Sequence, residues 1–448
     1  MHPLSSPTVL RRQGLSSWLC AAAFSVMACG AASAQNLLSL YDAARAFDAT
    51  YLSAQALANS ATFRAEQANA LGRPSAALNA SGARTHTEVL DFTRSATTSG
   101  VSLQARQPLF NRENSATIDQ AGKFLEVSRF DLEAAEQDLI LRVAQGYFDV
   151  LAAQDTLATT RASKAAINEQ LASAKRNFEV GTATITDTRE AQARFDLVTA
   201  QEIAADNDLR TKRIALDQLV GQVNVEPRPL RTPVRLPELE PGQADAWVMQ
   251  ADANHPTIRR AQLALDIAQL EIRKARAGHL PTLDAVGSVS RNRSPSSVLS
   301  TTNITSESAS LGLQLNVPLY SGNAVQNRVK ETLALEDRAR NDLEAARRGV
   351  VQAARQAFFG VQSGQAQVAA LEAAESSSQL ALEATQLGYK VGVRVNLDVL
   401  NAQTQLFTTR RDLARARYDV LIGSLRLRQA AGQLQPRDVS MLNQLLAP

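Results

Sequence analysis

Residues 177–192 read NFEVGTATITDTREAQ, and residues 388–403 read GYKVGVRVNLDVLNAQ. Both stretches interrupt a long helical pattern with Val-Gly, and both resume it with Asp and then Ala-Gln at the same spacing. Glycine readily adopts the left-handed backbone that ends a helix, and an acidic residue in the first turn of the next helix favours its positive end. Each stretch therefore predicts a turn between two helices, and the second turn lies 211 residues after the first.

Proline marks two matching helical blocks around these turns. It is absent from residues 109–226 and again from residues 319–435, and proline breaks helix interiors. Within these blocks we predict two long helices and two shorter ones that follow the turns, over 111–179, 322–390, 184–221 and 395–432. At about 1.5 Å per residue each long helix would reach about 100 Å. Helices of that length exclude a compact globule and indicate lateral packing in a bundle or tube.

Alternating apolar and polar residues precede each long helix. Leu103 and Leu109 belong to the first alternating run, and Leu313 belongs to the second. The pattern predicts β-hairpins over 74–110 and 281–320, each with one apolar and one polar face. Such a face suits either a half-buried soluble sheet or a membrane β-barrel, and alternation by itself leaves both open.

The chain thus contains two copies of one plan, in which a helix, a β-hairpin, a long helix and a second helix follow one another. The helices before the hairpins are predicted over about 37–72 and 252–278. Five prolines within residues 227–241 indicate an extended linker between the copies. The predicted division is a first repeat, a Pro-rich equatorial linker, a second repeat and a C-terminal tail, over 35–226, 227–250, 251–435 and 436–448.

Residues 1–34 have the three parts of a secretory signal peptide. A pair of arginines at 11–12 precedes an apolar segment, and the small-residue cleavage sequence ASA follows at 32–34. The mature chain is therefore expected to start at Gln35. The alternative is lipoprotein processing at Cys29, although the residues before this cysteine fit a lipobox poorly.

The composition excludes several classes of protein. Both cysteines lie in the predicted signal peptide, so the mature chain has neither a disulfide nor a thiolate metal site. The remaining histidines are far apart, no motif brings together a nucleophile, a base or metal ligands, and we expect neither an enzyme nor a cofactor. The formal net charge of +3 falls to +1 once two arginines are removed with the signal peptide, which gives no reason to expect nucleic acid. Beyond that peptide no run of 18 apolar residues occurs.

Four strands in one chain are too few for a membrane barrel. Such barrels need at least about eight strands, and open sheet edges are not tolerated in lipid. If the predicted strands enter a membrane, several chains must share one barrel, and three chains would supply twelve strands.

Three stretches, 177–196, 388–407 and 413–432 (LARARYDVLIGSLRLRQAAG), resemble the TolC family of outer-membrane channel proteins. The resemblance implies an α+β membrane protein, a homotrimer with a twelve-stranded outer-membrane β-barrel continuous with a long periplasmic α-helical barrel. It also implies an exit duct for tripartite efflux pumps or type I secretion, working with a periplasmic adaptor and an inner-membrane transporter of RND, ABC or MFS type. The alternative function is a periplasmic or secreted coiled-coil structural protein that forms no channel.

The resemblance also implies site residues at the two turns. A periplasmic gate would pair Tyr389 and Arg394 with Thr186 and Asp187, through an Arg–Asp link between adjacent coiled coils. A simple helical turn and a solvated arginine are the alternatives. Adaptor contacts are expected at Val180, Gly181, Thr182, Val391, Gly392 and Val393.

The pore constriction of the family is lined by two aspartates three residues apart. Here the first position is Asp398, but the second is Asn401. Residues three apart share a helix face, so a trimer would have one acidic ring beside a ring of amides. We therefore expect weaker cation block than two acidic rings would give.

Overall fold

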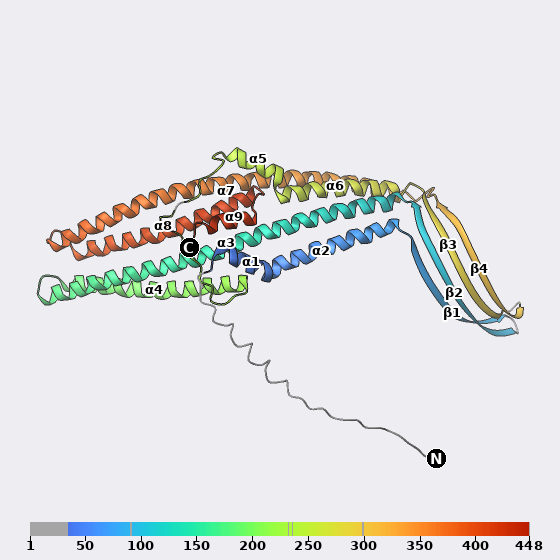
Figure 1. The fold of residues 1–448 in the computed structure, drawn as a ribbon, viewed down its shortest axis with the longest axis horizontal. Helices are drawn as coiled ribbons and strands as arrows, with labels where there is room; N and C mark the ends of the chain where they lie inside the picture. The colour runs from blue at the N-terminus through green and yellow to red at the C-terminus, as the bar shows by residue number, and fades with distance from the viewer. Residues whose placement is uncertain (1–34, 90–91, 232, 235, 298–299, 448) are drawn as a thin grey trace, which may run out of the picture.

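The computed structural model describes residues 35–447 apart from four short gaps, at 90–91, 232, 235 and 298–299. The predicted signal peptide, and with it the possible modification of Cys29, lies outside the described residues. The molecule is elongated, with two helical hairpin turns at one end and a four-stranded sheet at the other (Figure 1).

The first repeat begins with two helices separated by one residue and ends with the first helical hairpin. Its elements are α1 (Leu37–Phe47), α2 (Ala49–Asn69), the 3₁₀ turn η1 (Ala70–Gly72), β1 (Ser75–Val89), β2 (Phe92–Phe110), α3 (Arg112–Glu179) and α4 (Ile185–Val220).

The second repeat has the same order and adds a short C-terminal helix. Its elements are α5 (Ala244–Asn254), α6 (Pro256–Ala277), β3 (Thr282–Ser297), β4 (Ser300–Asn316), α7 (Ala324–Lys390), α8 (Asn396–Ala430) and α9 (Pro436–Asn443). The helix α9 falls in the predicted tail.

The helices before the hairpins differ from their prediction. Each was predicted as one helix, but Asp48 and His255 take extended backbone angles and divide them. His255 precedes Pro256, and the residue before a proline avoids helical angles, so α6 restarts with proline at its first position. The predicted linker, 227–250, is also shorter than expected because α5 already begins at Ala244.

The predicted second hairpin, 281–320, is too long. Strand β4 ends at Asn316, and Pro318 lacks the N–H that a strand needs to pair. Gly322 and Asn323 then take positive φ angles of 61° and 63°, which turn the chain into α7.

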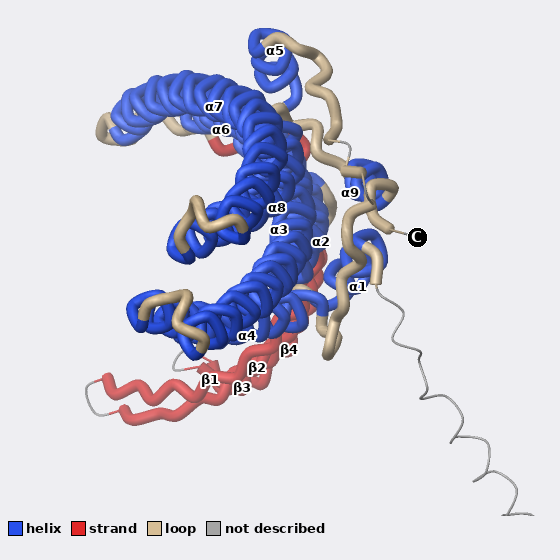
Figure 2. The backbone as a smooth tube through the Cα atoms, turned by 90° about the vertical axis from the view of Figure 1, so that its left-hand side faces the viewer, coloured by secondary structure: helices blue, strands red, loops and turns tan. Residues whose placement is uncertain are grey.

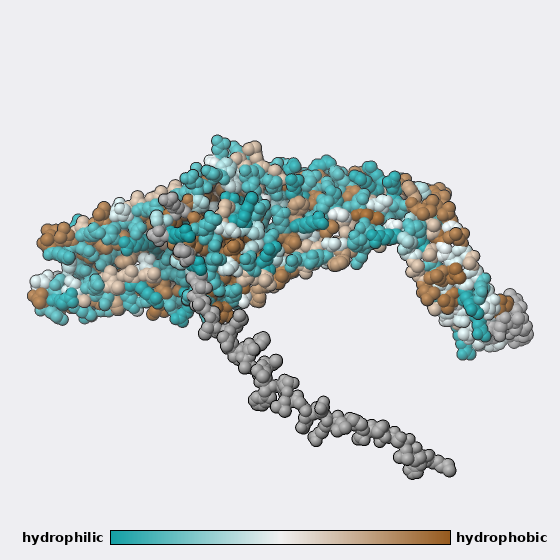
Figure 3. All heavy atoms as spheres, viewed as in Figure 1, coloured by the Kyte–Doolittle hydropathy of each residue, from teal (hydrophilic) through white to brown (hydrophobic). Residues whose placement is uncertain are grey.

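The four strands form one antiparallel sheet in the order β1-β2-β3-β4. Leu78 pairs with Leu103, and Leu103 pairs with Val289, so these three exposed side chains lie on one face. On the opposite face the hydroxyls of Ser288 and Ser310 are hydrogen-bonded at 2.8 Å. Hydrophobic residues are visible over the part of the sheet nearest the helices (Figure 3). The sheet therefore presents an apolar and a polar face, as the alternation predicted.

The helices form a curved layer, with α1, α5 and α9 along its convex side (Figure 2). Toward the hairpin turns, α3 packs against α4 and α8, and α8 packs against α7. Toward the sheet, α3 packs against α2 and α6, and α6 packs against α7. The long helix α7 is therefore flanked along its length by two shorter helices placed end to end, and α3 is flanked by two such pairs (Figure 1).

The main hydrophobic core lies midway along the layer. Tyr147, Phe148 and Tyr418 are buried in contact there, together with side chains of α1 and α9. The Tyr147 hydroxyl donates to the carbonyl of Arg228 at 2.8 Å, and the Tyr418 hydroxyl donates to Asp155 at 2.7 Å. These bonds anchor the linker and α8 to α3.

We expect Asp48→Ala to lower the free energy of unfolding by about 2 kcal/mol at neutral pH. The Asp48 carboxylate caps α2 by accepting from the Tyr51 N–H at 2.8 Å, and Arg142 donates to it at 2.8 and 3.0 Å. The hydrogen bonds from Arg142 chiefly lower the pKa of Asp48. This stabilisation is therefore present at neutral pH and is lost as pH falls through the folded-state pKa.

Denaturant unfolding of the detergent-solubilised protein measures this effect, with Asp48→Asn as the matched control. Asparagine also caps helices, so this control should lose only the contribution of the charge. Equal unfolding free energies for the alanine variant and the parent protein would contradict the assignment.

Candidate channel entrance

The two hairpin turns have the same backbone geometry. Gly181 and Gly392 both have φ of 80°, and no atom lies within 4 Å of the place a Cβ would take. In each turn the residue after glycine donates its N–H to the carbonyl five residues earlier, at 2.8 Å in the first turn and 2.9 Å in the second. This left-handed closure of the helix C-terminus requires glycine in both turns.

Apolar side chains project from the tips of both turns. Val180 is 72% exposed, and Val391 and Val393 are 66% and 74% exposed. Thr182 beside them is exposed as well. Clustered exposed valines at the end of a long polar hairpin indicate a contact surface for another molecule.

The helices that follow the turns begin differently in the two repeats. In the first, Thr184 and Asp187 form a reciprocal capping box. In the second, Val395 takes the place of the threonine and has no side-chain oxygen with which to cap α8. The equivalent carboxylate, Asp398, is therefore free of a capping role, and it lies 3.6 Å from the Arg394 guanidinium.

The predicted gate residues are not joined to one another within the described chain. Arg394 pairs with Asp398 instead of Asp187, whose carboxylate is held by its own helix cap. The Tyr389 hydroxyl accepts a hydrogen bond from the Asn177 amide at 3.1 Å. Thr186 is exposed next to the cap. The predicted pairing is therefore not made within one chain, where the capping box holds the aspartate, and it stays a prediction for contacts between adjacent coiled coils.

A buried asparagine joins the two hairpins. The Asn396 side chain is 1% exposed and accepts a hydrogen bond from the Gln170 amide of α3. It also donates to the carbonyl of Asp187 in α4 at 3.3 Å. The equivalent residue in the first repeat is Ile185, which is 49% exposed. Aligning the repeats reveals this apolar-to-polar exchange, but only the structure shows that the asparagine is buried between hairpins.

Asn401 makes a further contact between the hairpins. Its side-chain oxygen accepts from the Arg194 guanidinium of α4 at 2.9 Å. Asp398 and Asn401 lie three residues apart on α8, so they share a helix face. Neither Arg194 nor Gln170 was singled out by sequence reasoning.

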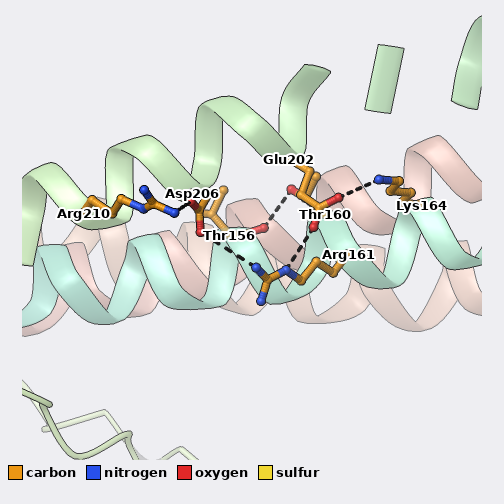
Figure 4. A network of polar contacts seen from close by, with 7 residues as sticks. All are labelled: Thr156, Thr160, Arg161, Lys164, Glu202, Asp206 and Arg210. Carbon is orange, nitrogen blue, oxygen red and sulfur yellow. Dashed lines mark hydrogen bonds and ion pairs between the residues drawn. The ribbon is translucent and has the colours of Figure 1, made fainter. Parts of the chain in front are cut away.

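The first hairpin is stiffened by an ion-pair network between α3 and α4 (Figure 4). Arg161 and Lys164 contact Glu202 at 3.0 and 2.9 Å, and Arg161 lies 3.8 Å from Asp206. Arg210 pairs with Asp206 at 2.7 Å. The Lys164 ammonium, followed by Arg161, lowers the pKa of Glu202. The network ties α4 to α3 along the first hairpin.

The described residues offer neither a metal site nor a membrane-spanning helix. None of their His, Cys, Asp and Glu side chains gather into a group that could hold a metal ion. None of the helices in this part of the chain combines the length and apolar character needed to cross a membrane.

Curated relatives share most of the chain. Outer membrane protein TolC of Vibrio cholerae is 36% identical over 338 residues, which cover 75% of this chain and 77% of that protein. Outer membrane protein TolC of Escherichia coli is 32% identical and covers 77% and 72%. The alkaline protease secretion protein AprF of Pseudomonas aeruginosa is 34% identical and covers 76% and 71%.

Solved structures share the fold. The outer membrane protein VceC of Vibrio cholerae aligns with a TM-score of 0.76 at 18% identity, covering 88% of this chain and 96% of that one. CusC aligns with a TM-score of 0.77 at 18% identity, covering 89% and 92%.

The long paired hairpins and the four-stranded sheet with an apolar face define a protomer of an outer-membrane channel. The sequence model of the outer membrane efflux protein family matches residues 40–222 and 247–433. The chain belongs to this family. Three chains build a twelve-stranded barrel that continues into a long periplasmic helical barrel. The protein is an exit duct of efflux or secretion systems in the outer membrane. The family match and these similarities confirm the predicted fold class, function and location.

Proposed function

We propose that the end carrying the two hairpin turns is the periplasmic entrance of the duct, and that it receives a periplasmic adaptor. The observation that carries this proposal is the exposed apolar tip of each hairpin. The adaptor contacts are Val180, Gly181 and Thr182 in the first turn, and Val391, Gly392 and Val393 in the second.

The duct works with an inner-membrane transporter that supplies the energy, and the chain itself carries out no catalysis. Transporters of RND, ABC or MFS type fit this role. Relatives are named for protease secretion, such as AprF of Pseudomonas aeruginosa, and for efflux, such as BepC of Brucella suis. Export of small molecules and export of proteins therefore both fit one duct, with the cargo chosen by the transporter.

The contacts between the two hairpins act as the gate. Tyr389, Asn396 and Asn401 of the second hairpin bond to residues of the first. Opening the entrance by swinging the second hairpin outward would break these bonds. Arg394 keeps its gate role through contacts to the Asp187 region of a neighbouring chain, and Asp398 with Asn401 lines the constriction.

Purified protein in planar lipid bilayers tests the channel function directly. We expect trimers that dissociate only on heating and that conduct ions. A protein that fractionates away from the outer membrane and leaves bilayers electrically silent would favour the coiled-coil structural alternative.

Introducing charge at the second tip is expected to abolish export while leaving the trimer intact. The double variant Val391→Asp and Val393→Asp places charges where an apolar adaptor surface would dock, so transport should fall at least about tenfold. Val223→Asp is the matched control, because Val223 is 84% exposed and lies beyond the far end of α4. Export is measured with the cognate adaptor and transporter present. Equal export by both variants would show that the adaptor does not dock on this tip.

A further inference from the structure

The predicted constriction includes a positively charged side chain, Arg194, that its sequence pattern does not predict. Arg194 reaches from α4 to α8 and donates to Asn401 at 2.9 Å. Asn401 lies at the position where a second acidic residue was expected. The guanidinium therefore stands beside a neutral amide, and Asn401, which carries this amide, lies one helical turn from Asp398 on α8.

Among the residues that the structure describes, the Arg194 guanidinium has no ion-pair partner. Asp398, by contrast, already has Arg394 at 3.6 Å. Counted with the Asp187 carboxylate at the same end of the hairpins, these groups sum to zero charge in each protomer. Without Arg194 they would sum to one negative charge in each protomer.

Further polar residues follow Asn401 along the same face of α8. Thr404, Thr408 and Arg411 follow Asn401 along α8 at steps of three or four residues, which is the spacing of one helix face. They line a groove between α3, α4 and α8 together with Arg194. Arg411 is paired with Asp412 at 2.8 Å. Of the two arginines that line this groove, Arg194 is therefore the one without an ion-pair partner in the described part of the chain.

We propose that Arg194 is a selectivity residue that counteracts Asp398, so that the entrance does not prefer cations and admits small anions at least as readily. This inference rests on the proposed placement of Asp398 and Asn401 at the constriction. Fixed charges lining a narrow passage set the sign of the ions it favours. Because the Asp398 carboxylate already lies 3.6 Å from Arg394, the Arg194 guanidinium adds a second positive charge to the surroundings of that carboxylate.

Reversal potentials across planar bilayers in asymmetric KCl test the proposal. The parent trimer should show a potassium-to-chloride permeability ratio at or below one. Arg194→Gln should raise that ratio at least about threefold, since each removed charge changes the local potential. Arg194→Lys keeps the charge and should keep the ratio. Arg210→Gln, on the same helix, is the control for loss of an arginine elsewhere.

Asp398→Asn separates this inference from the placement of the constriction. We expect it to lower the permeability ratio further. If Asp398→Asn shifts the ratio and Arg194→Gln does not, the role of Arg194 is overturned while the constriction stands. If neither variant shifts the ratio, both are overturned. A parent channel with strong cation preference would also overturn the role of Arg194.

Discussion

Replacing Asn396 by alanine should raise the resting conductance of the channel at least about tenfold. Asn396 is buried at 1% exposure between the hairpins, where it satisfies the Gln170 amide and the Asp187 carbonyl. Alanine removes both bonds. The Asp187 carbonyl keeps its backbone bond within α4, but the partly buried Gln170 amide loses its partner, which costs about 1–3 kcal/mol. Separation of the hairpins returns the Gln170 amide to water. The substitution therefore destabilises the closed entrance relative to the open one.

The size of the effect follows from the threefold assembly. A shift of about 1.4 kcal/mol changes an equilibrium tenfold, and three protomers each lose two bonds. Single-channel recordings of the trimer without adaptor measure the change. Asp187→Ala should have a smaller effect, because the bond from Asn396 goes to the backbone carbonyl.

Ile185→Ala is the matched control for Asn396→Ala. Ile185 takes the equivalent place in the first repeat, where it is 49% exposed, and no hydrogen bond from its side chain links the hairpins. Its resting conductance should equal that of the parent. Indistinguishable recordings from Asn396→Ala, Ile185→Ala and the parent would show that the buried asparagine does not hold the entrance closed.

Replacing Gly432 by alanine should prevent formation of a stable trimer. Gly432 has φ of 67° and packs against the break between α5 and α6. A Cβ there would lie 2.6 Å from the His255 Cα and 2.8 Å from its nitrogen. These are backbone atoms that cannot move without displacing both helices. We expect a loss of about 3 kcal/mol or more beyond the backbone strain.

Gly392→Ala isolates the packing contribution. Gly392 has a similar positive φ of 80°, so alanine there should lower the free energy of unfolding by a comparable amount, about 1 kcal/mol, through backbone strain. Nothing lies within 4 Å of its would-be Cβ. Heat-resistant trimers on gels and thermal unfolding compare the two variants. Equal melting temperatures would show that the contact between Gly432 and His255 does not limit stability.

The parts of the fold that depend on local chemistry were predictable. Val-Gly turns and proline-free runs placed the long helices, and α3 begins and ends within one residue of its predicted range. Strand alternation predicted the apolar face of the sheet. The breaks at Asp48 and His255 were missed although a helix-capping residue and a His-Pro pair mark them, because the apolar pattern continues across both positions.

The sequence by itself determined the repeat, the two turns, the helix lengths and the family resemblance, because each depends on residues close together in the chain. Only the tertiary structure decided which side chains of the entrance meet. Asn396 contacts Gln170, and Arg194 contacts Asn401, across more than two hundred residues. Such pairs depend on the rotation and offset of one hairpin against the other. That geometry follows from side-chain packing along the whole helical layer, and no local spacing specifies it.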